Sequence, residues 1–244
     1  MNKPTASPSF RPLYEQIKVL LTQSLIAGEW KPGDAIPSEM ELASRFKVSQ
    51  GTVRKAIDEL AAENILLRRQ GKGTFVATHN EEAMKLRFLR LTSSAGKKEV
   101  LQNRLLEFTR SKASGEVARL LDLKVGTATI EVKRLLSFSD RALIHDHIII
   151  PAFPFKGLTG SRIQDNKGSM YSMYESQYGI RMVRAEERLK AVAANAEVAG
   201  ELGLPVGSPL LSIERISYTY GDKPMEWRLG LCVTDDHHYM NELE

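Results

Sequence analysis

The chain has 244 residues, of which 34 are Lys or Arg and 30 are Asp or Glu, for a formal net charge of +4. With 42% hydrophobic and 26% charged residues it has the composition of a soluble globular protein, which excludes extended disorder, collagen-like repeats and a disulfide scaffold. The longest apolar run, residues 143–155, is interrupted by charged and histidine residues and is far shorter than the roughly 20 apolar residues of a membrane span. The single cysteine and the lack of a secretion signal predict a cytoplasmic protein without internal disulfides or membrane contact.

The small basic excess is unevenly distributed. Residues 1–78 hold 11 Lys or Arg and 8 Asp or Glu, a net of +3, whereas the other 166 residues hold 23 and 22, a net of +1. A mildly basic first third is compatible with a nucleic-acid partner, although many unrelated domains share this property.

The first predicted elements are two amphipathic helices. Apolar residues recur at helical spacing from Leu13 to Leu21, and the glycine at position 28 marks the end of the first helix. Ser38 and Glu41 have the spacing of a capping box, so a second helix begins there, and its expected core side includes Met40 and Leu42.

The next segment completes a winged helix-turn-helix. Ser49 is the expected N-cap of a third helix, whose stripe of Val53, Ile57 and Leu60 faces the core. About three residues join it to the second helix, as in a helix-turn-helix. Residues 65–69 and 74–76 are predicted strands, joined by a turn at residues 70–73 that forms the wing.

The third helix and the wing supply the candidate DNA-binding residues. Polar side chains at the start of a recognition helix reach phosphates and base edges, and Gln50 and Arg54 suit adenine and guanine respectively. The opposing interpretation is that Arg54 and Lys55 lie on an ordinary solvated helix face. The predicted set is Ser38, Glu39, Arg45, Ser49, Gln50, Thr52, Arg54, Lys55, Gly71, Lys72 and Gly73.

This first third resembles a known family. The segments 13–17, 28–34, 36–39, 52–56 and 71–76 closely resemble the DNA-binding domain of GntR-family transcriptional regulators. The resemblance implies a dimer that reads a palindromic double-stranded operator with its third helix and wing. Many members have arginine where this chain has Gln50, so we expect an operator read with less guanine contact at that position.

The last two-thirds contain an internal repeat. Residues 116–134 recur at 197–215, shifted by 81, with eight identities in 19 positions. Each copy predicts a short helix, a Val-Gly turn and a hairpin, with strands at 129–138 and 143–150, and at 210–220 and 224–234. The predicted fold class is therefore α+β, with residues 1–78 as the winged helix, 79–94 as a linker and 95–244 as an antiparallel-sheet domain.

The repeat places two arginines and two carboxylates in corresponding strands. Arg134 corresponds to Arg215, and with one residue of difference in the hairpin turn Asp146 is expected to correspond to Glu226. Arginines of this kind hold a ligand carboxylate or phosphate. The alternative is a pair of structural salt bridges at the ends of the sheet.

The second region resembles the UTRA effector domain of HutC-like GntR regulators, whose fold is like that of chorismate lyase. The similarity rests on the Arg134 strand, on residues 168–171 opening a helix, on the repeated helix-turn unit and on residues 221–226. It implies a pocket for a small effector. Sugar-phosphate-binding members often have an arginine where this chain has Leu136, so a smaller or less charged carboxylate effector is expected. The predicted effector-binding residues are Arg134, Asp146, Ser169, Tyr171, Arg215 and Glu226.

Three other functions are alternatives to a transcriptional regulator: an enzyme, a metal sensor and a redox switch. An enzyme of chorismate-lyase-like fold is not supported, because the sequence contains neither a nucleophile motif nor a phosphate-binding loop motif. A metal sensor would use His145 and His147 on one strand face, with the histidines at 237 and 238 near the end of the other repeat. Cys232 has no basic neighbour or resolving thiol to make it a redox switch. The sequence thus predicts a ligand-responsive repressor that is not an enzyme and needs no cofactor or metal.

Overall fold

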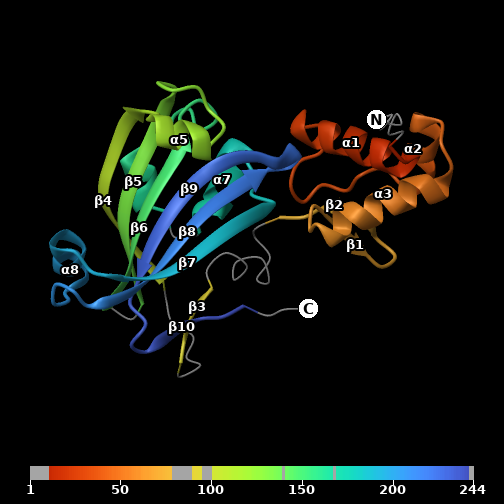
Figure 1. Cartoon of the computed structure of the whole chain (residues 1–244). Coiled ribbons are helices and arrows are strands. Elements are labelled where there is room, and N and C mark those ends of the chain that lie inside the picture. Colours follow the sequence, from red (N-terminus) through yellow and green to blue (C-terminus); the bar gives the residue numbers. More distant parts are fainter. Residues whose placement is uncertain (1–10, 79–89, 95–100, 139–140, 167–168, 242–244) are drawn as a thin grey trace, which may run out of the picture. The chain divides into compact units, whose positions relative to one another are not determined.

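The computed structural model describes residues 11–78, 90–94, 101–138, 141–166 and 169–241. The chain divides into two compact units, Met1–Ala77 and Thr78–Glu244, each considered by itself (Figure 1). The predicted linker, 79–94, falls mostly on residues 79–89, which lie outside the described residues. Its last part, Leu91–Ser93, forms strand β3 of the second unit.

The N-terminal unit is a winged helix-turn-helix, which confirms the predicted fold. Helices α1 (Leu13–Ile26), α2 (Glu39–Phe46) and α3 (Gln50–Ala62) precede strands β1 (Leu66–Arg69) and β2 (Gly73–Val76), which pair antiparallel. The capping box forms as expected, because the Ser38 side chain accepts from the Glu41 amide while the Glu41 carboxylate accepts from the Ser38 amide.

The core of this unit lies between α1 and α3. Ile17 and Leu21 of α1 and Val53 and Ile57 of α3 are each at most 2% exposed. The expectation that Met40 faces the core is wrong, since its side chain is 71% exposed. Met40 lies in the first turn of α2, which has eight residues. Leu42 is the buried residue among these eight, so its side of the helix, and not that of Met40, faces the core.

The C-terminal unit is built on one six-stranded antiparallel sheet with the order β4-β5-β6-β9-β8-β7 (Figure 1). A separate two-stranded sheet pairs β3 with β10 (His237–Tyr239). The six strands are β4 (Leu101–Lys112), β5 (Ala128–Phe138), β6 (Arg141–Pro151), β7 (Arg184–Ala193), β8 (Pro209–Thr219) and β9 (Lys223–Cys232).

The repeat seen in the sequence is a structural repeat of strand, helix, strand and strand. Helices α5 (Gly115–Leu120) and α8 (Ala196–Leu202) are capped by Ser114 and Asn195, which are 81 residues apart. The turn after each helix has the same hydrogen bond, from the Gly126 amide to the Ala113 carbonyl and from the Gly207 amide to the Ala194 carbonyl, both 2.8 Å. The two copies meet where β6 pairs with β9, so the sheet has an approximate two-fold axis between these strands.

The remaining helices cover one part of the sheet. Helices α6 (Gly160–Gln164) and α7 (Met170–Tyr178) connect the two copies, and α7 begins at the N-cap Ser169 and ends at Gly179. One buried cluster joins α7 to the sheet through residues such as Ile148 and Tyr174, and a second joins α8 and β3 to β5 and β6. Figure 1 shows α7 behind the sheet and α5 in front of it. Within the described residues, no helix has both the length and the apolar character that a membrane crossing requires.

Candidate DNA-binding surface and effector pocket

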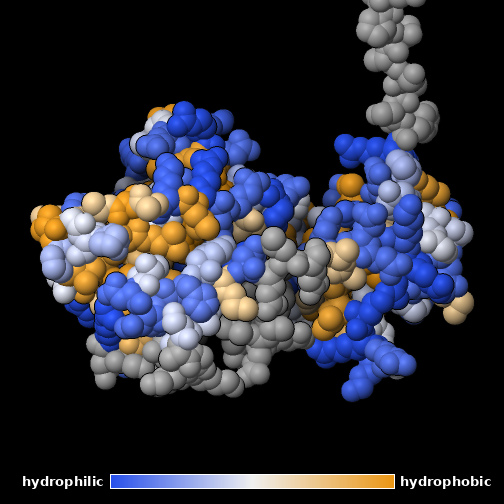
Figure 2. Space-filling view, turned by 60° about the horizontal axis from the view of Figure 1, so that its bottom comes forward, coloured by the Kyte–Doolittle hydropathy of each residue, from blue (hydrophilic) through white to orange (hydrophobic). Residues whose placement is uncertain are grey.

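The N-terminal end of α3 presents the predicted polar residues to solvent. The Ser49 hydroxyl accepts from the Thr52 amide at 3.2 Å and lies 2.8 Å from the Thr52 hydroxyl, so both side chains are held in the first turn. Gln50 is exposed beside them. The face of the N-terminal unit visible at the right of Figure 2 is mostly hydrophilic, as expected for a domain whose partner is a charged backbone.

Glu39 connects the recognition helix to the wing. Its Oε2 accepts from Arg54 Nε at 2.9 Å and from Gln50 Nε2 at 3.3 Å, and its Oε1 lies 2.9 Å from a terminal nitrogen of Arg68. Burial raises the pKa of Glu39, but the hydrogen bonds from Arg68, Arg54 and Gln50 outweigh it, and the pKa lies below its ordinary value. The structure therefore brings two predicted residues, Gln50 and Arg54, together around the carboxylate of a third, Glu39.

Two predicted cations point elsewhere. The Arg45 guanidinium pairs with both carboxylate oxygens of Glu29 and lies 5.4 Å from the centre of the Phe46 ring. The Lys55 ammonium lies 3.8 Å from the centre of the Tyr14 ring on α1. In the free protein neither side chain belongs to the cluster around Glu39.

The wing tip and one strand residue complete this surface. Gly71 and Gly73 have φ values of +70° and +105°, which favour glycine, and they flank the exposed Lys72. Arg68 was not among the predicted residues, although it precedes the wing turn by only a few positions. Its donors reach Glu39 and also Asp58 of α3, where Nε and Nη2 lie 3.1 and 2.8 Å from Oδ1. The alternation of side chains along β1 predicts that Arg68 and Arg69 point to opposite faces. It does not predict the partners of Arg68, because Glu39 and Asp58 lie 29 and 10 residues away in the sequence.

In the C-terminal unit, Arg134 and Asp146 form a buried ion pair between neighbouring strands. Arg134 donates from Nε at 2.8 Å and from Nη2 at 2.7 Å to Oδ2 of Asp146. The two residues are 5% and 2% exposed. Burial by itself raises the pKa of the Asp146 carboxyl, but Arg228 and Arg134 outweigh it, so the pKa lies below its ordinary value.

Glu226 is fully buried and accepts hydrogen bonds from three side chains. Arg228 donates to both carboxylate oxygens at 2.9 and 3.0 Å, Tyr171 donates at 2.7 Å, and Tyr174 donates at 3.1 Å. A terminal nitrogen of Arg228 also lies 3.5 Å from Asp146 Oδ2. Because Tyr171 and Tyr174 come from α7, Glu226 ties this helix to the sheet.

Arg215 extends the same network toward the sheet edge. Its Nε donates to Glu187 Oε1 at 2.7 Å, and a terminal nitrogen lies 3.5 Å from the Tyr171 hydroxyl, which also lies 2.8 Å from the Ser217 hydroxyl. Tyr239 of β10 donates to the other oxygen of Glu187. Five of the six predicted effector residues are thus connected, through Arg228 as an additional member.

The expected correspondence of Asp146 with Glu226 is wrong. Arg134 pairs across the strands with Asp146, whereas its repeat partner Arg215 pairs with Arg228, so Arg228 corresponds to Asp146. Three residues, Tyr220–Asp222, separate β8 from β9, whereas two positions of the sequence separate β5 from β6. The longer connection moves the match one residue forward rather than back. Glu226 still joins the network, because it lies two residues before Arg228 and its side chain is therefore on the same face of the strand.

A small cavity lies against the charged network. Its volume is about 40 Å³, enough for a few water molecules but not for an organic effector unless the lining moves apart. Both charged and apolar residues line the cavity. It is lined by Arg90, Asp146, Arg215 and Arg228, by Leu91, Leu136, Ile144 and Ile213, and by Gly230 and Cys232.

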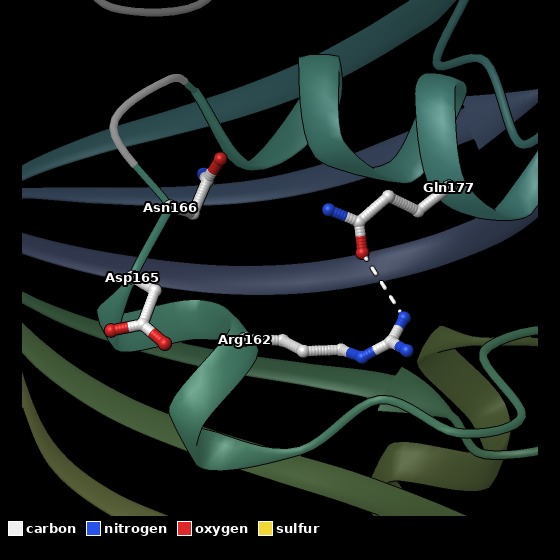
Figure 3. A pocket seen from close by; sticks show the side chains of 4 residues that line it. All are labelled: Arg162, Asp165, Asn166 and Gln177. Atoms are coloured by element: carbon white, nitrogen blue, oxygen red, sulfur yellow. Dashed lines mark hydrogen bonds between the residues drawn. The ribbon is translucent and has the colours of Figure 1, made fainter.

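Ser169 lies outside this network. Its hydroxyl accepts from the Ser172 amide at 3.0 Å, so Ser169 is the N-cap of α7. Nearby, Arg162, Asp165, Asn166 and Gln177 line a hollow of about 510 Å³ that is open to solvent (Figure 3). Arg162 donates to Gln177 there at 3.3 Å, and the hollow shares no lining residue with the charged cavity.

The histidines of the metal alternative are not gathered into one site. His147 Nε2 lies 2.6 Å from Glu131 Oε1, and its ring meets Trp227 edge to face. His145 Nε2 lies 2.9 Å from Glu201 Oε2 on α8. Among the residues that the structure describes, no group of three or more His, Cys, Asp or Glu side chains is arranged to hold a metal ion.

The fold and the two sites define a DNA-binding regulator of transcription with a separate ligand-sensing unit. Residues 13–76 match the model described as bacterial regulatory proteins, gntR family, and residues 96–238 match the UTRA domain. The chain belongs to the GntR family, with the domain combination of its HutC-like subfamily, and it is a regulator rather than an enzyme.

Several relatives share this organisation. The chain is 31% identical over 230 residues to the HTH-type transcriptional regulator YurK of Bacillus subtilis, covering 93% of both chains, and 29% identical to the repressor NagR of the same organism, covering 95% of this chain and 96% of that one. The ligand-binding domain of a GntR-family regulator from Bordetella bronchiseptica has a TM-score of 0.63 and 43% identity, covering 65% of this chain and 98% of that domain. The protein is a ligand-responsive transcriptional regulator.

Proposed function

We propose that the protein is a repressor that leaves its operator when a small anionic effector enters the cavity beside Asp146, Arg215 and Arg228. The observation that carries this proposal is a cavity whose lining combines charged side chains with apolar ones. Arg215 and Arg228 suit a carboxylate, and Asp146 suits a hydroxyl or ammonium group on the same molecule. Leu136, which also lines the cavity, favours a small carboxylate over a sugar phosphate.

The proposal includes a homodimer on a palindromic operator. Two copies of α3 and its wing read the two half-sites, with Ser49, Gln50, Thr52 and Arg54 at the groove and Lys72 at the phosphates. An effector that binds better to the DNA-incompetent arrangement shifts the population away from the operator. Linkage then requires that operator DNA weaken effector binding by the same factor.

Helix α7 connects the charged network to the first residue of the C-terminal unit. Its residues Tyr171 and Tyr174 donate to Glu226 in the network. Further along the same helix, Glu175 accepts from the hydroxyl of Thr78, the first residue of the C-terminal unit. An effector that displaces the tyrosines would therefore move the helix that holds the start of this unit.

The test begins with ligands. A thermal-shift screen of small carboxylates, amino-acid catabolites and sugar phosphates against the full chain should find a stabilising carboxylate, and Arg228→Ala should abolish that shift. Arg162→Ala removes an exposed guanidinium outside the network and should leave it unchanged. A compound that stabilises the wild type and Arg228→Ala equally would place the effector elsewhere.

The DNA arm uses a duplex selected by the wild type from a randomised pool. Arg54→Ala should abolish retention of this duplex in a gel shift while the thermal shift with the effector persists. Undiminished retention would refute the assignment of α3 as the recognition helix.

A further inference from the structure

Two carboxylates lie on the side of α3 that carries Arg54. Glu39 contacts Arg54 directly, and Asp58 follows Arg54 by one helical turn and so shares its face. Phosphates of a bound duplex would repel both carboxylates, because DNA carries one negative charge for about every 1.7 Å of its axis. A protein that places acids here needs a cation that stays with them when DNA is bound.

Arg68 is placed to be that cation. Its terminal nitrogens lie 2.9 Å from Glu39 Oε1 and 2.8 Å from Asp58 Oδ1, so one guanidinium bridges both acids. Arg68 contacts Oε1 of Glu39 and Arg54 donates to Oε2, so the two arginines bind different oxygens of the same carboxylate. Burial lowers the pKa of Arg68, but the hydrogen bonds that it donates to Glu39 and Asp58 outweigh this and raise it.

We propose that Arg68 is a positioning residue for operator binding, which neutralises Glu39 and Asp58 so that Arg54 can turn from Glu39 to the DNA. In the free protein Glu39 holds Arg54 and Arg68 together. When Arg54 moves to a phosphate or a base edge, Glu39 keeps Arg68 and does not face the duplex as an unpaired charge. Without Arg68, Arg54 either stays with Glu39 or leaves it uncompensated, and either outcome weakens binding.

Arg69 provides a matched control on the same strand. Its guanidinium lies 4.8 Å from the centre of the Phe75 ring, and neighbouring residues of a strand point to opposite faces. Arg69→Ala removes the same charge from the wing without removing the bridge between the two acids. Any loss that comes from net charge alone therefore affects both variants.

The experiment measures affinity for the selected duplex by fluorescence anisotropy at several KCl concentrations, with the full chain. Arg68→Ala should weaken binding by about tenfold or more, since leaving like charges opposed costs over 1 kcal/mol. Adding Glu39→Gln and Asp58→Asn to Arg68→Ala should restore affinity, because the acids that Arg68 neutralises are gone. The same two changes should not rescue Arg69→Ala.

The salt dependence separates positioning from direct contact. If Arg68 is a positioning residue, the slope of log affinity against log salt in the triple variant, with both acids neutralised, returns to that of the wild type. A phosphate contact of Arg68 itself would be missing there too, and its loss would keep the slope lower by about one. Arg68→Lys keeps a charge but lacks the two separate terminal nitrogens with which the guanidinium contacts Glu39 and Asp58, so it should bind weakly too, and it guards against misfolding of the alanine variant. Wild-type affinity in Arg68→Ala, or a lowered slope without rescue, would overturn the proposal.

Discussion

Asp146 and Arg228 occupy equivalent positions in the two repeats, although one side chain is negatively charged and the other positively charged. Each lies opposite an arginine of the neighbouring strand, Arg134 for Asp146 and Arg215 for Arg228. They flank the pair His147–Leu229, through which the approximate two-fold axis of the sheet passes. A symmetric site of four arginines would be unstable when buried, and Asp146 in one copy, with Glu226 and Glu187, compensates the cations.

Asp146→Asn should destabilise the C-terminal unit by about 3–5 kcal/mol, because it leaves Arg134 buried without its acid and leaves Arg228 with Glu226 as its remaining acid. The pKa of Asp146 is lowered from 3.8 in the folded protein, so its charge contributes stability that is fully present above about pH 4 and is lost as the pH falls through the folded pKa. Urea unfolding of wild type and variant from pH 7 to pH 3 should show a constant difference that shrinks only below pH 4. A difference that already declined between pH 7 and pH 5 would contradict this assignment.

Gly230→Ala should block the effector response by filling the cavity. A Cβ at this position would meet Ile144 Cγ2 at 3.7 Å and Cys232 Sγ at 3.8 Å, which are ordinary contacts, so the fold should persist. A methyl group occupies much of a cavity of about 40 Å³. The effector-induced thermal shift should therefore fall, while affinity for the selected duplex is retained.

The control for this variant is Gly200→Ala, on α8, where a Cβ meets nothing within 4 Å. It should keep both the thermal shift and DNA binding. If Gly230→Ala responded to effector as Gly200→Ala does, the ligand would have to bind away from this wall of the cavity.

Cys232 should resist alkylation in the folded protein. Burial raises its pKa from 9.0 to about 12, so at pH 8.5 the thiolate is about a thousandfold scarcer than in the unfolded chain. The neutral thiol thus favours the folded state below pH 9, and this contribution is lost as the pH rises toward 12. Iodoacetamide labelling followed by mass spectrometry should be slow without urea and fast in it, and equal rates would show that the cavity wall opens readily.

Local patterns predicted most of the fold, and contacts between distant residues explain what they missed. The Ser38–Glu41 capping box spans three residues, and the repeat spacing of 81 is written in the sequence, so both were found. Arg68 was missed because its role depends on Glu39, 29 residues away. Arg228 was missed because its place depends on the length of one turn, which sequence spacing alone did not determine.

Thr78→Val should uncouple the two units without disabling either. It removes the hydrogen bond from the Thr78 hydroxyl to Glu175, while valine keeps the shape of the side chain. Because Thr78 follows Ala77, whose amide donates to the Ile65 carbonyl at 3.1 Å next to the wing, this bond lies where the C-terminal unit begins. Binding of the selected duplex and the effector thermal shift should each persist, but effector should release less DNA in a competition titration.

The control is Thr109→Val, which removes another hydrogen bond between a threonine and a glutamate, to Glu107. Effector should release DNA from this variant as it does from the wild type. Equal release by the two variants would show that coupling does not pass through Thr78.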